Sequence, residues 1–435
     1  MLYVTKFGGT SLASASQFKK VKSIIDDNKL RKVVVVSAPG KRDKLDNKIT
    51  DLLYLLAAHI RYGVSYENVL MMIKERYLEI KNDLDLKIDL DYEFKAIVDD
   101  IKNKESEEYL VSRGEYLCAK MMAEYLGFAF CDSFDLIRFN YDGTINDELT
   151  SKAISEAYQK NGNIVVPGFY GSYPNKRIKL FSRGGSDITG SLLAKALCAT
   201  KYENWTDVSG ILVADPKIIN NPKRIQEVTY EELRELSYMG ASVLHEETIF
   251  PIQDLNIPIH ILNTNHPEDE GTVICKEATE ASQVITGISG KRDFMSFTII
   301  KDRTANKMDV IEECLDILRR YHIFIEHIPT SIDSFSLVVE KKQVEKSMYE
   351  IISEMKKNKD ILDVDIDEDV ALVAVVGRNM VTRPGVSAKI FSIFGKEQIN
   401  IKMIAQGAKE INIIVGISNA DFERSIKAVY DNMVA

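Results

Sequence analysis

Disulfide-forming, membrane-spanning and strongly basic segments are all missing from this chain of 435 residues. The five cysteines are scattered without a C-x-x-C pair, which excludes a disulfide framework and the common zinc sites. No apolar run approaches the roughly 20 residues that cross a bilayer. Acidic residues outnumber basic ones, 65 to 56, and no basic tract occurs, so we expect no nucleic-acid partner. The N-terminus is typical of a strand rather than a signal peptide, so we expect a cytoplasmic protein with no membrane partner.

Length and apolar content predict two or three globular domains. A hydrophobic fraction of 45% is ordinary for packed cores, and domains average roughly 150 residues. Residues 32–38 and 164–169 contain unbroken apolar runs, which are typical of strands buried on both faces of a parallel sheet. Helical patterns are expected at 13–28, 49–58, 66–108 and 233–244. The first 279 residues or so therefore predict an α/β domain.

A lysine and two glycines come directly after the first expected strand, in Lys6-Phe7-Gly8-Gly9-Thr10-Ser11. Glycines let backbone N–H groups approach an anion. A helix expected from about residue 13, capped by Thr10 or Ser11, favours negative charge at its N-terminus. Lys6 adds a full positive charge. The stretch predicts a phosphate-binding turn, although it is not the G-x-x-x-x-G-K-[ST] P-loop. The alternative is a tight strand-to-helix turn with a solvated lysine.

Two further motifs combine glycine with charged residues. Arg183-Gly184-Gly185-Ser186-Asp187 leads into an apolar helix expected at 192–199, and Arg183 offers a planar fork for a carboxylate or phosphate. Asp187 is an acid in a loop rich in anion-binding features, which favours a role with a lysine, a metal or a substrate cation. Ser112-Arg113-Gly114-Glu115 opens another helix. Glu115 either stabilises the first turn of that helix or pairs with a substrate ammonium.

Other polar residues near strand ends have ordinary structural explanations. Ser37 and Thr50 come after a buried strand, at the edge where open α/β sheets bind ligands. A capping hydroxyl is nevertheless the better explanation of either residue alone. Asp207 and Asp215 suit turns, and His245 is interpreted as a packing histidine.

Residues after about 283 contain two copies of one small unit. Cys314 and Ile390, and likewise Ile323 and Ile399, are 76 positions apart, and the apolar positions between them match without a gap. Each copy has the order strand, helix, strand, strand, helix, strand. This match indicates a duplicated α+β domain. The second copy could bind a small ligand near Asn400, or the two copies together could serve only for dimerisation.

Five motifs occur together and in order, and the set resembles aspartate kinase, of the amino-acid-kinase superfamily. They are Lys6-Phe7-Gly8-Gly9-Thr10-Ser11, Ser112-Arg113-Gly114-Glu115, Arg183-Gly184-Gly185-Ser186-Asp187, Thr206-Asp207-Val208-Ser209-Gly210 and Gly240-Ala241-Ser242-Val243-Leu244-His245. The duplicated tail resembles the tandem ACT domains of these enzymes. No dehydrogenase domain follows, so the monofunctional form is the one resembled.

The resemblance implies a three-layer α/β/α catalytic domain with a mainly parallel sheet, followed by two ferredoxin-like α+β ACT domains. The implied boundaries are 1–282 for the catalytic domain and 294–366 for the first, inserted ACT domain. Residues 283–293 and 367–435 would form the second ACT domain, with 284–290 adding a strand to it.

The resemblance also implies that ATP, with Mg²⁺, phosphorylates the side-chain carboxylate of L-aspartate. The catalytic residues would be Lys6, backed by the amides of the turn, and Asp187. The substrate would contact Ser37, Thr50, Glu115, Arg183, Gly184, Gly185 and Ser186. The nucleotide would contact Lys6, Phe7, Gly8, Gly9, Thr206, Asp207, Leu212, Asp215, Lys217, Ser242 and Val243. Mg²⁺ would arrive with the ATP, and no protein ligand for it is named.

Three departures from the family pattern concern Asp51, Leu212 and residues 242–246. The family often has asparagine at position 51, tyrosine at position 212, and Lys-Val-Leu-His-Pro at 242–246. The last two departures affect the adenosine side of the site.

The ACT pair implies feedback by an end-product amino acid, with lysine favoured over threonine. It also implies a homodimer or a dimer of dimers. Glu326, Ser331 and Asp333 could meet a lysine effector, or they could form a solvated hairpin edge.

Two other functions are consistent with parts of the sequence. One is a related kinase acting on glutamate or acetylglutamate, against which the ACT tail and the motif at 112–115 argue. The other is a catalytically silent amino-acid sensor. The joint presence of Lys6, Arg183 and Asp187 argues against a silent copy.

Overall fold

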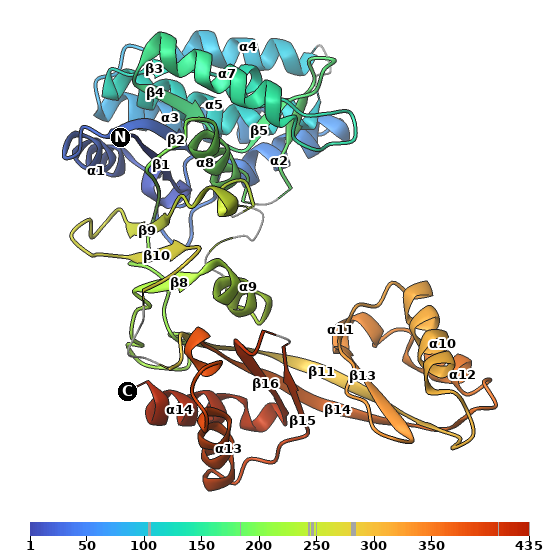
Figure 1. Ribbon diagram of the computed structural model, residues 1–435. Helices are drawn as coiled ribbons and strands as arrows, with labels where there is room; N and C mark the ends of the chain where they lie inside the picture. The colour runs from blue at the N-terminus through green and yellow to red at the C-terminus, as the bar shows by residue number, and fades with distance from the viewer. Residues whose placement is uncertain are drawn as a thin grey trace. The chain divides into compact units, whose positions relative to one another are not determined.

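The computed structural model describes residues 1–102, 106–182, 184–241, 244, 248, 250–279, 284–407 and 409–434 (Figure 1). The chain divides into two compact units. The first comprises residues 1–211, 226–230 and 243–278, and the second comprises residues 212–225, 231–242 and 279–435.

An eight-stranded sheet forms the centre of the first unit. Its strands, in spatial order, are β3 (Ala129–Phe130), β4 (Ile164–Pro167), β2 (Arg31–Val36), β1 (Tyr3–Phe7), β7 (Lys201–Thr206), β9 (Ile259–Asn263), β10 (Thr272–Cys275) and β8 (Glu227–Thr229). Pairing is parallel from β3 to β9, and β10 runs antiparallel to β9. The central strand β2 is buried on both faces, with Val33 to Val36 fully covered, as its unbroken apolar run predicts.

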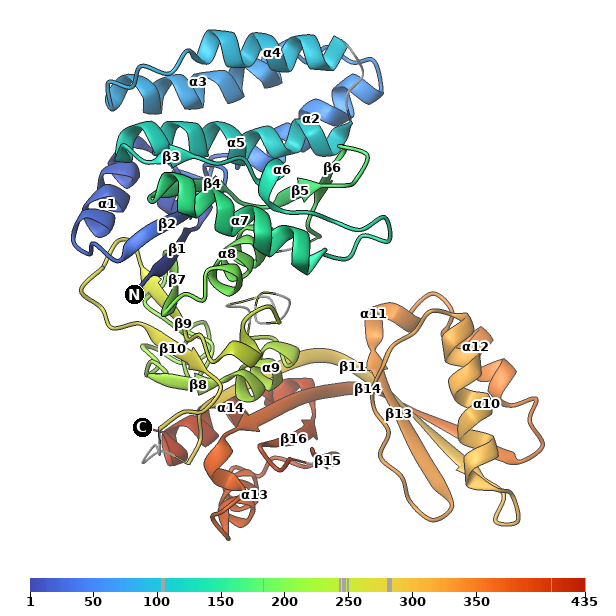
Figure 2. The same cartoon turned by 45° about the horizontal axis from the view of Figure 1, so that its top comes forward.

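Helices cover both faces of this sheet, so the three-layer α/β prediction is confirmed. α5 packs on β2, β3 and β4, and α8 packs on β1, β2 and β7. Figure 2 shows α3 and α4 as a further layer outside α2 and α5. The helices of this unit are η1 (Gly9–Leu12), α1 (Ala15–Asp26), α2 (Ile49–Arg61), α3 (Glu67–Asp83), α4 (Leu90–Lys102), α5 (Glu107–Leu126), α6 (Ser133–Leu136), α7 (Asp147–Asn161), α8 (Gly185–Ala196) and η3 (Gln253–Leu255). A two-stranded ribbon, β5 (Tyr170–Ser172) and β6 (Ile178–Leu180), lies beside them.

Two helices begin earlier than the sequence predicts, and both changes affect candidate site residues. α5 begins at Glu107, where the Ser106 hydroxyl accepts the Tyr109 N–H, so Glu115 lies in the helix interior rather than in its first turn. α8 begins at Gly185 rather than at residue 192, which places Asp187 in the first turn of a helix. At α8 the glycine and serine at the true start have low helix propensity, which hid the start of that helix.

Two other expected boundaries are also wrong. Thr10 and Ser11 lie in the short η1 helix and do not cap α1, which has Ser14 at its N-cap position. α9 spans Tyr230–Tyr238, three residues earlier at its start than predicted.

A six-stranded antiparallel sheet forms the second unit. Its strands, in spatial order, are β12 (Ile325–His327), β13 (Ser334–Glu340), β11 (Gly287–Lys301), β14 (Ile361–Val376), β16 (Asn412–Ile417) and β15 (Met403–Gln406). Its helices are α9, α10 (Lys307–Arg320), α11 (Lys341–Val344), α12 (Met348–Met355), η4 (Arg378–Met380), α13 (Val386–Lys396), η5 (Asn419–Asp421) and α14 (Phe422–Met433). None of the helices in the described ranges has the length and apolarity needed to span a membrane.

The internal repeat of the sequence is visible in this sheet. α10 ends at Arg320 and α13 ends at Lys396, which preserves the offset of 76. The turns that follow also match, since His322 (φ 56°) and Gln398 (φ 54°) both adopt the left-handed conformation. β11 and β14 each serve both copies: residues 287–291 of β11 pair with the end of β14, and residues from 294 onward also pair with β13.

Candidate active site

Lys6, Asp187 and Asn204 form a buried polar cluster at the carboxyl end of β1. Lys6 Nζ lies 2.6 Å from Asp187 Oδ1 and donates to Asn204 Oδ1 at 3.3 Å. Asn204 Nδ2 in turn donates to Asp187 Oδ1 at 2.9 Å. An ammonium has three donors, and this cluster uses two of them. The Lys6 charge is therefore held at a fixed point with one donor left for a ligand.

The sequence analysis missed Asn204, which is the bridge of this cluster. Parallel pairing of β1 with β7 places Asn204 beside Lys6, and its side chain is only 4% exposed. The strand gave no clear signal, because β7 also carries Lys201, Glu203 and Thr206 and has no unbroken apolar run.

The glycine turn after β1 is closely packed on one side and open on the other. The Gly8 N–H donates to Trp205 O at 2.9 Å, so the expectation that this amide backs an anion is wrong. Within the described residues the N–H groups of Gly9 and Thr10 have no acceptor. A Cβ on Gly8 would lie 3.6 Å from Lys6 Nζ, in ordinary contact, whereas one on Gly9 would lie 2.9 Å from Ala38 O. The protein itself therefore tolerates a side chain at Gly8, on the side that Lys6 faces.

Glu115 is a buried carboxyl group with one unpaired oxygen. It is 4% exposed, and its Oε2 has no hydrogen-bond partner among the residues that the structure describes. Burial raises the pKa of Glu115 to about 7, although a hydrogen bond from the Ala38 N–H acts in the opposite direction. The approach of α5 to β2 depends on Gly114, where a Cβ would lie 2.9 Å from Ala38 Cβ. A buried acid with one free carboxyl oxygen is a candidate for binding a cation.

The start of α8 is the other predicted substrate-binding element. Gly184 holds the left-handed conformation (φ 60°) at the N-cap, and Gly185 and Ser186 come next in the first turn. A Cβ on Gly168 would lie 2.5 Å from Ser186 Oγ, so the end of β4 touches the start of this helix. The positive end of α8 thus faces the carboxyl edge of the sheet. Arg183 lies outside the described residues.

Ser37 and Thr50 lie near the same edge. Ser37 follows β2 directly, and its N–H donates to Phe7 O at 3.2 Å, beside the glycine turn. Thr50 lies in the first turn of α2, whose N-cap is Lys48. The capping role weighed for Thr50 is therefore not found.

The predicted nucleotide residues divide into three groups. Thr206 and Asp207 lie at the carboxyl end of β7, next to β1. Leu212, Asp215 and Lys217 belong to the second unit, where Asp215 Oδ1 accepts the Lys217 N–H at 2.8 Å and forms a turn. Ser242 and Val243, together with His245, lie outside the described residues. Contact of all three groups with a nucleotide stays a prediction.

Across the described parts of the chain, no three His, Cys, Asp or Glu side chains come together as a metal site. Asp187, the acid beside the glycine turn, already accepts from Lys6 and Asn204. The donors near the turn are an ammonium and amides, which suit phosphate oxygens rather than a metal.

The three candidate effector residues lie along β12 and the turn that follows it. Glu326 is on β12; its side chain interacts with Tyr238, but its Oε2 is buried without a partner among the described residues. Ser331 O accepts from Lys307 Nζ at 2.6 Å, and Asp333 Oδ2 lies 3.6 Å from Arg303 Nε. Glu326 is therefore the one with unused capacity for a cation.

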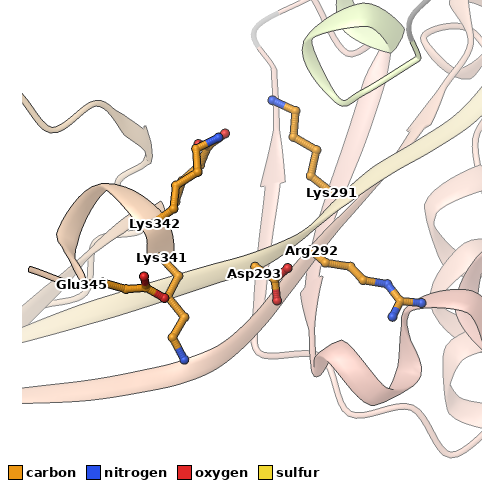
Figure 3. Close-up of a pocket in the computed structure, with 7 residues that line it drawn as sticks. Lys291, Arg292, Asp293, Lys341, Lys342 and Glu345 are labelled. Carbon is orange, nitrogen blue, oxygen red and sulfur yellow. The ribbon is translucent and has the colours of Figure 1, made fainter.

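A separate hollow of about 690 Å³ lies between β11 and the end of β13 in the second unit (Figure 3). Much of its charge is already neutralised, because Arg292, Lys341 and Lys342 are paired with acids at 2.7 to 2.9 Å. We therefore assign no ligand to this hollow. Its lining residues are Lys291, Arg292, Asp293, Glu340, Lys341, Lys342 and Glu345.

Comparisons with known proteins agree with this geometry. Residues 1–263 match the model of the amino acid kinase family, and residues 373–433 match an ACT domain. Aspartokinase 3 of Bacillus subtilis is 33% identical over 99% of this chain and 98% of its own length. The crystal structure of Clostridium acetobutylicum aspartate kinase has 45% identity and a TM-score of 0.95, covering 99% of this chain and 100% of that one.

Two structures of Escherichia coli aspartokinase III are also similar. One is in complex with aspartate and ADP, and the other is in complex with lysine and aspartate. Each has 25% identity, a TM-score of 0.76 and full coverage of both chains. The chain therefore belongs to the aspartokinases of the amino acid kinase family, which are phosphotransferases.

Proposed function

We propose that this protein transfers the γ-phosphoryl group of ATP to the side-chain carboxylate of L-aspartate and forms 4-phospho-L-aspartate. The observation that carries the proposal is the buried Lys6–Asp187–Asn204 cluster beside the glycine turn, with the unpaired Glu115 on the neighbouring helix. Phosphoryl transfer requires positioning and charge stabilisation more than covalent chemistry. A fixed cation and a site for an ammonium meet those requirements.

The acceptor side would bind aspartate through its α-amino and α-carboxylate groups. Glu115 supplies a negative charge for the ammonium. Arg183 and the N-terminus of α8, with Gly184 to Ser186, supply the carboxylate site. Ser37 and Thr50 would contact the side-chain carboxylate of aspartate, which would then face the glycine turn.

The donor side would hold the phosphates at the glycine turn. Lys6 stabilises negative charge on the transferring group, and Asp187 and Asn204 keep the ammonium in place. Gly9 and Thr10 offer amides to phosphate oxygens, and Thr206 and Asp207 begin the nucleotide site. Mg²⁺, bound to the phosphates of ATP, would neutralise part of their charge; no protein ligand for it is assigned.

Regulation by an end-product amino acid is the second part of the proposal. The Escherichia coli relative is known in complex with lysine, and we favour lysine, with threonine as the alternative. Glu326 would bind the ammonium of the effector, near Ser331 and Asp333.

The proposed domains are 1–282 (catalytic), 294–366 (first ACT), and 283–293 with 367–435 (second ACT). We further propose a cytoplasmic homodimer, or a dimer of dimers, through the ACT domains.

The first experiment measures ADP release by the purified full chain with Mg-ATP and L-aspartate, with and without lysine or threonine. Aspartate-dependent release supports the kinase, and suppression by lysine identifies the effector. Release that depends on glutamate or acetylglutamate instead would contradict the substrate. Lysine binding without any release would indicate a silent sensor.

Gly8→Ala is expected to lower kcat/KM for Mg-ATP about tenfold without lowering the thermal midpoint Tm. The added methyl group has room within the protein but occupies space in front of Lys6 Nζ, where a phosphate would lie. Steady-state kinetics and thermal melting test this. Gly9→Ala is the control, because its methyl group would collide with Ala38 O and should lower Tm as well. Unchanged kinetics in Gly8→Ala would place the phosphates elsewhere.

Glu326→Gln is expected to raise the lysine concentration for half-inhibition about tenfold, because a charge-assisted bond is lost. kcat without lysine should stay unchanged. Inhibition curves for Glu326→Gln and Glu345→Gln test this, since Glu345 lines the charged hollow instead. A shift seen only in Glu345→Gln would move the effector site to that hollow.

A further inference from the structure

Two adjacent residues of α3, Arg76 and Tyr77, reach two parts of the candidate active site. Sequence patterns did not predict this, because residues 66–108 were interpreted as a charged helical excursion without catalytic residues. Both side chains are buried: Arg76 is 5% exposed and Tyr77 is fully covered. Each makes a hydrogen bond to the backbone of a segment that carries proposed site residues.

Arg76 joins both ends of the loop that follows β2. Its Nη1 donates to Gly40 O at 3.0 Å, and its Nη2 donates to both carboxylate oxygens of Asp46 at 2.5 Å. Burial alone would raise the pKa of Asp46. Hydrogen bonds from Arg42 and the positive charge of Arg76 outweigh this effect and hold the pKa well below its ordinary value. Asp46 is therefore ionised at neutral pH, which maintains its ion pair with Arg76.

The Gly40 end of this loop presses on the phosphate turn. The Gly40 N–H donates to Gly9 O at 2.7 Å, and a Cβ on Gly40 would lie 2.6 Å from the Gly9 carbonyl carbon. Gly40 and Gly9 are therefore in close van der Waals contact, with no room for a side chain between them. A displacement of Gly40 is therefore transmitted to Gly9, whose N–H faces the proposed phosphate site.

Tyr77 makes the corresponding contact on the acceptor side. Its hydroxyl donates to Gly114 O at 2.7 Å, at the residue before Glu115. Gly114 lies against Ala38 and Leu53, where a Cβ would come within 2.9 Å of both side chains. The hydroxyl therefore helps to fix the turn of α5 that carries the unpaired carboxyl.

We propose that Arg76 and Tyr77 are positioning residues for the phosphoryl-transfer reaction. Arg76 fixes the phosphate turn through Gly40 and Gly9, and Tyr77 fixes Glu115 through Gly114. This proposal rests on the proposed function. The two residues have separate kinetic signatures, because Arg76 acts on the transferring group and Tyr77 acts on the binding of the amino acid.

The test begins with aspartate-dependent ADP release by the unmodified chain, because its absence would refute the proposed function and not this inference. Arg76→Lys keeps the positive charge but loses the planar guanidinium group that bonds both Gly40 and Asp46. We expect kcat to fall at least tenfold, with KM for aspartate changed less than threefold. Arg31→Lys is the matched control. Arg31 also binds one carboxylate twice, that of Glu203, and one backbone carbonyl, that of Ile24, at the start of β2. The Arg31→Lys variant should have a lower Tm and an unchanged kcat.

Tyr77→Phe removes only the hydroxyl group. We expect KM for aspartate to rise about fivefold, with kcat and KM for Mg-ATP within twofold of the unmodified values. Tyr230→Phe is the matched control, because the buried Tyr230 hydroxyl likewise donates to one carbonyl, Ile257 O, at 2.8 Å. The control should lose a similar amount of Tm with no kinetic change.

Equal losses of Tm in each pair, with kinetic constants unchanged in all four variants, would show that Arg76 and Tyr77 only stabilise the fold and would overturn the proposal. Where Arg76→Lys does not fold, Asp46→Asn tests the same connection from the loop side. It should lower kcat as Arg76→Lys does, and an unchanged kcat in Asp46→Asn would equally overturn the role of Arg76.

Discussion

Lys6→Ala is expected to lower kcat by two to three orders of magnitude, which corresponds to about 3–4 kcal/mol of barrier. The ammonium is 2.6 Å from Asp187 and held in place before any ligand binds, so its loss removes a preorganised charge. The fold should survive, because Asp187 keeps its hydrogen bond from Asn204. Single-turnover ADP formation and thermal melting measure the two effects separately.

The matched control for this variant is Lys195→Ala. Lys195 also pairs with an aspartate, Asp147, at 2.8 Å, but at the far end of α8 and on the surface. It should leave kcat unchanged. If Lys6→Ala keeps more than a tenth of the normal turnover, the assignment of Lys6 as the charge stabiliser is wrong. If the inactive variant still binds lysine, its second unit is intact.

Glu115→Gln is expected to raise KM for aspartate roughly 100-fold, because a buried charge that faces the substrate ammonium is lost. The unmodified enzyme should also show a pH dependence. With the pKa of Glu115 at about 7, kcat/KM for aspartate should rise as pH increases through 7, since the ionised form binds the ammonium. In Glu115→Gln this rise should disappear.

The same substitution should stabilise the protein above pH 7. A folded pKa raised from 4.5 to about 7 means that the folded state binds the extra proton between these values, so the free energy of unfolding falls as pH rises through that window. The loss is complete above pH 7 and is on the order of 3 kcal/mol. Glu115→Gln removes it, so Tm should increase at pH 8 and change little at pH 5.

Glu124→Gln, an exposed position on the same helix, is the control for both measurements. It should alter neither KM for aspartate nor the pH dependence of Tm. An unchanged KM in Glu115→Gln, or a Tm lower at pH 8 than that of the unmodified chain, would contradict the role given to the buried carboxyl.

Local sequence patterns determined the architecture of both units. The unbroken valine run of β2 indicates a parallel sheet, because only strands covered on both faces lack polar alternation. The offset of 76 between the two small domains is preserved down to the left-handed residues His322 and Gln398. Glycine turns involve neighbours in the chain and could be predicted, whereas the caps expected at Thr10, Ser11 and Thr50 are not found.

Only the tertiary structure decided the electrostatics of the site. Lys6 meets Asp187 and Asn204 because β1, α8 and β7 pack together, although nearly 200 positions separate Lys6 from Asn204. The sequence placed Glu115 in a first helical turn, as a stabilising acid or a partner for a substrate ammonium, whereas the structure buries it in the helix interior with one oxygen unpaired and a raised pKa. Arg76 and Tyr77 support the site from a helix that has no motif at all. Burial, pairing and support depend on segments distant in sequence, and periodicity along the chain carries no information about them.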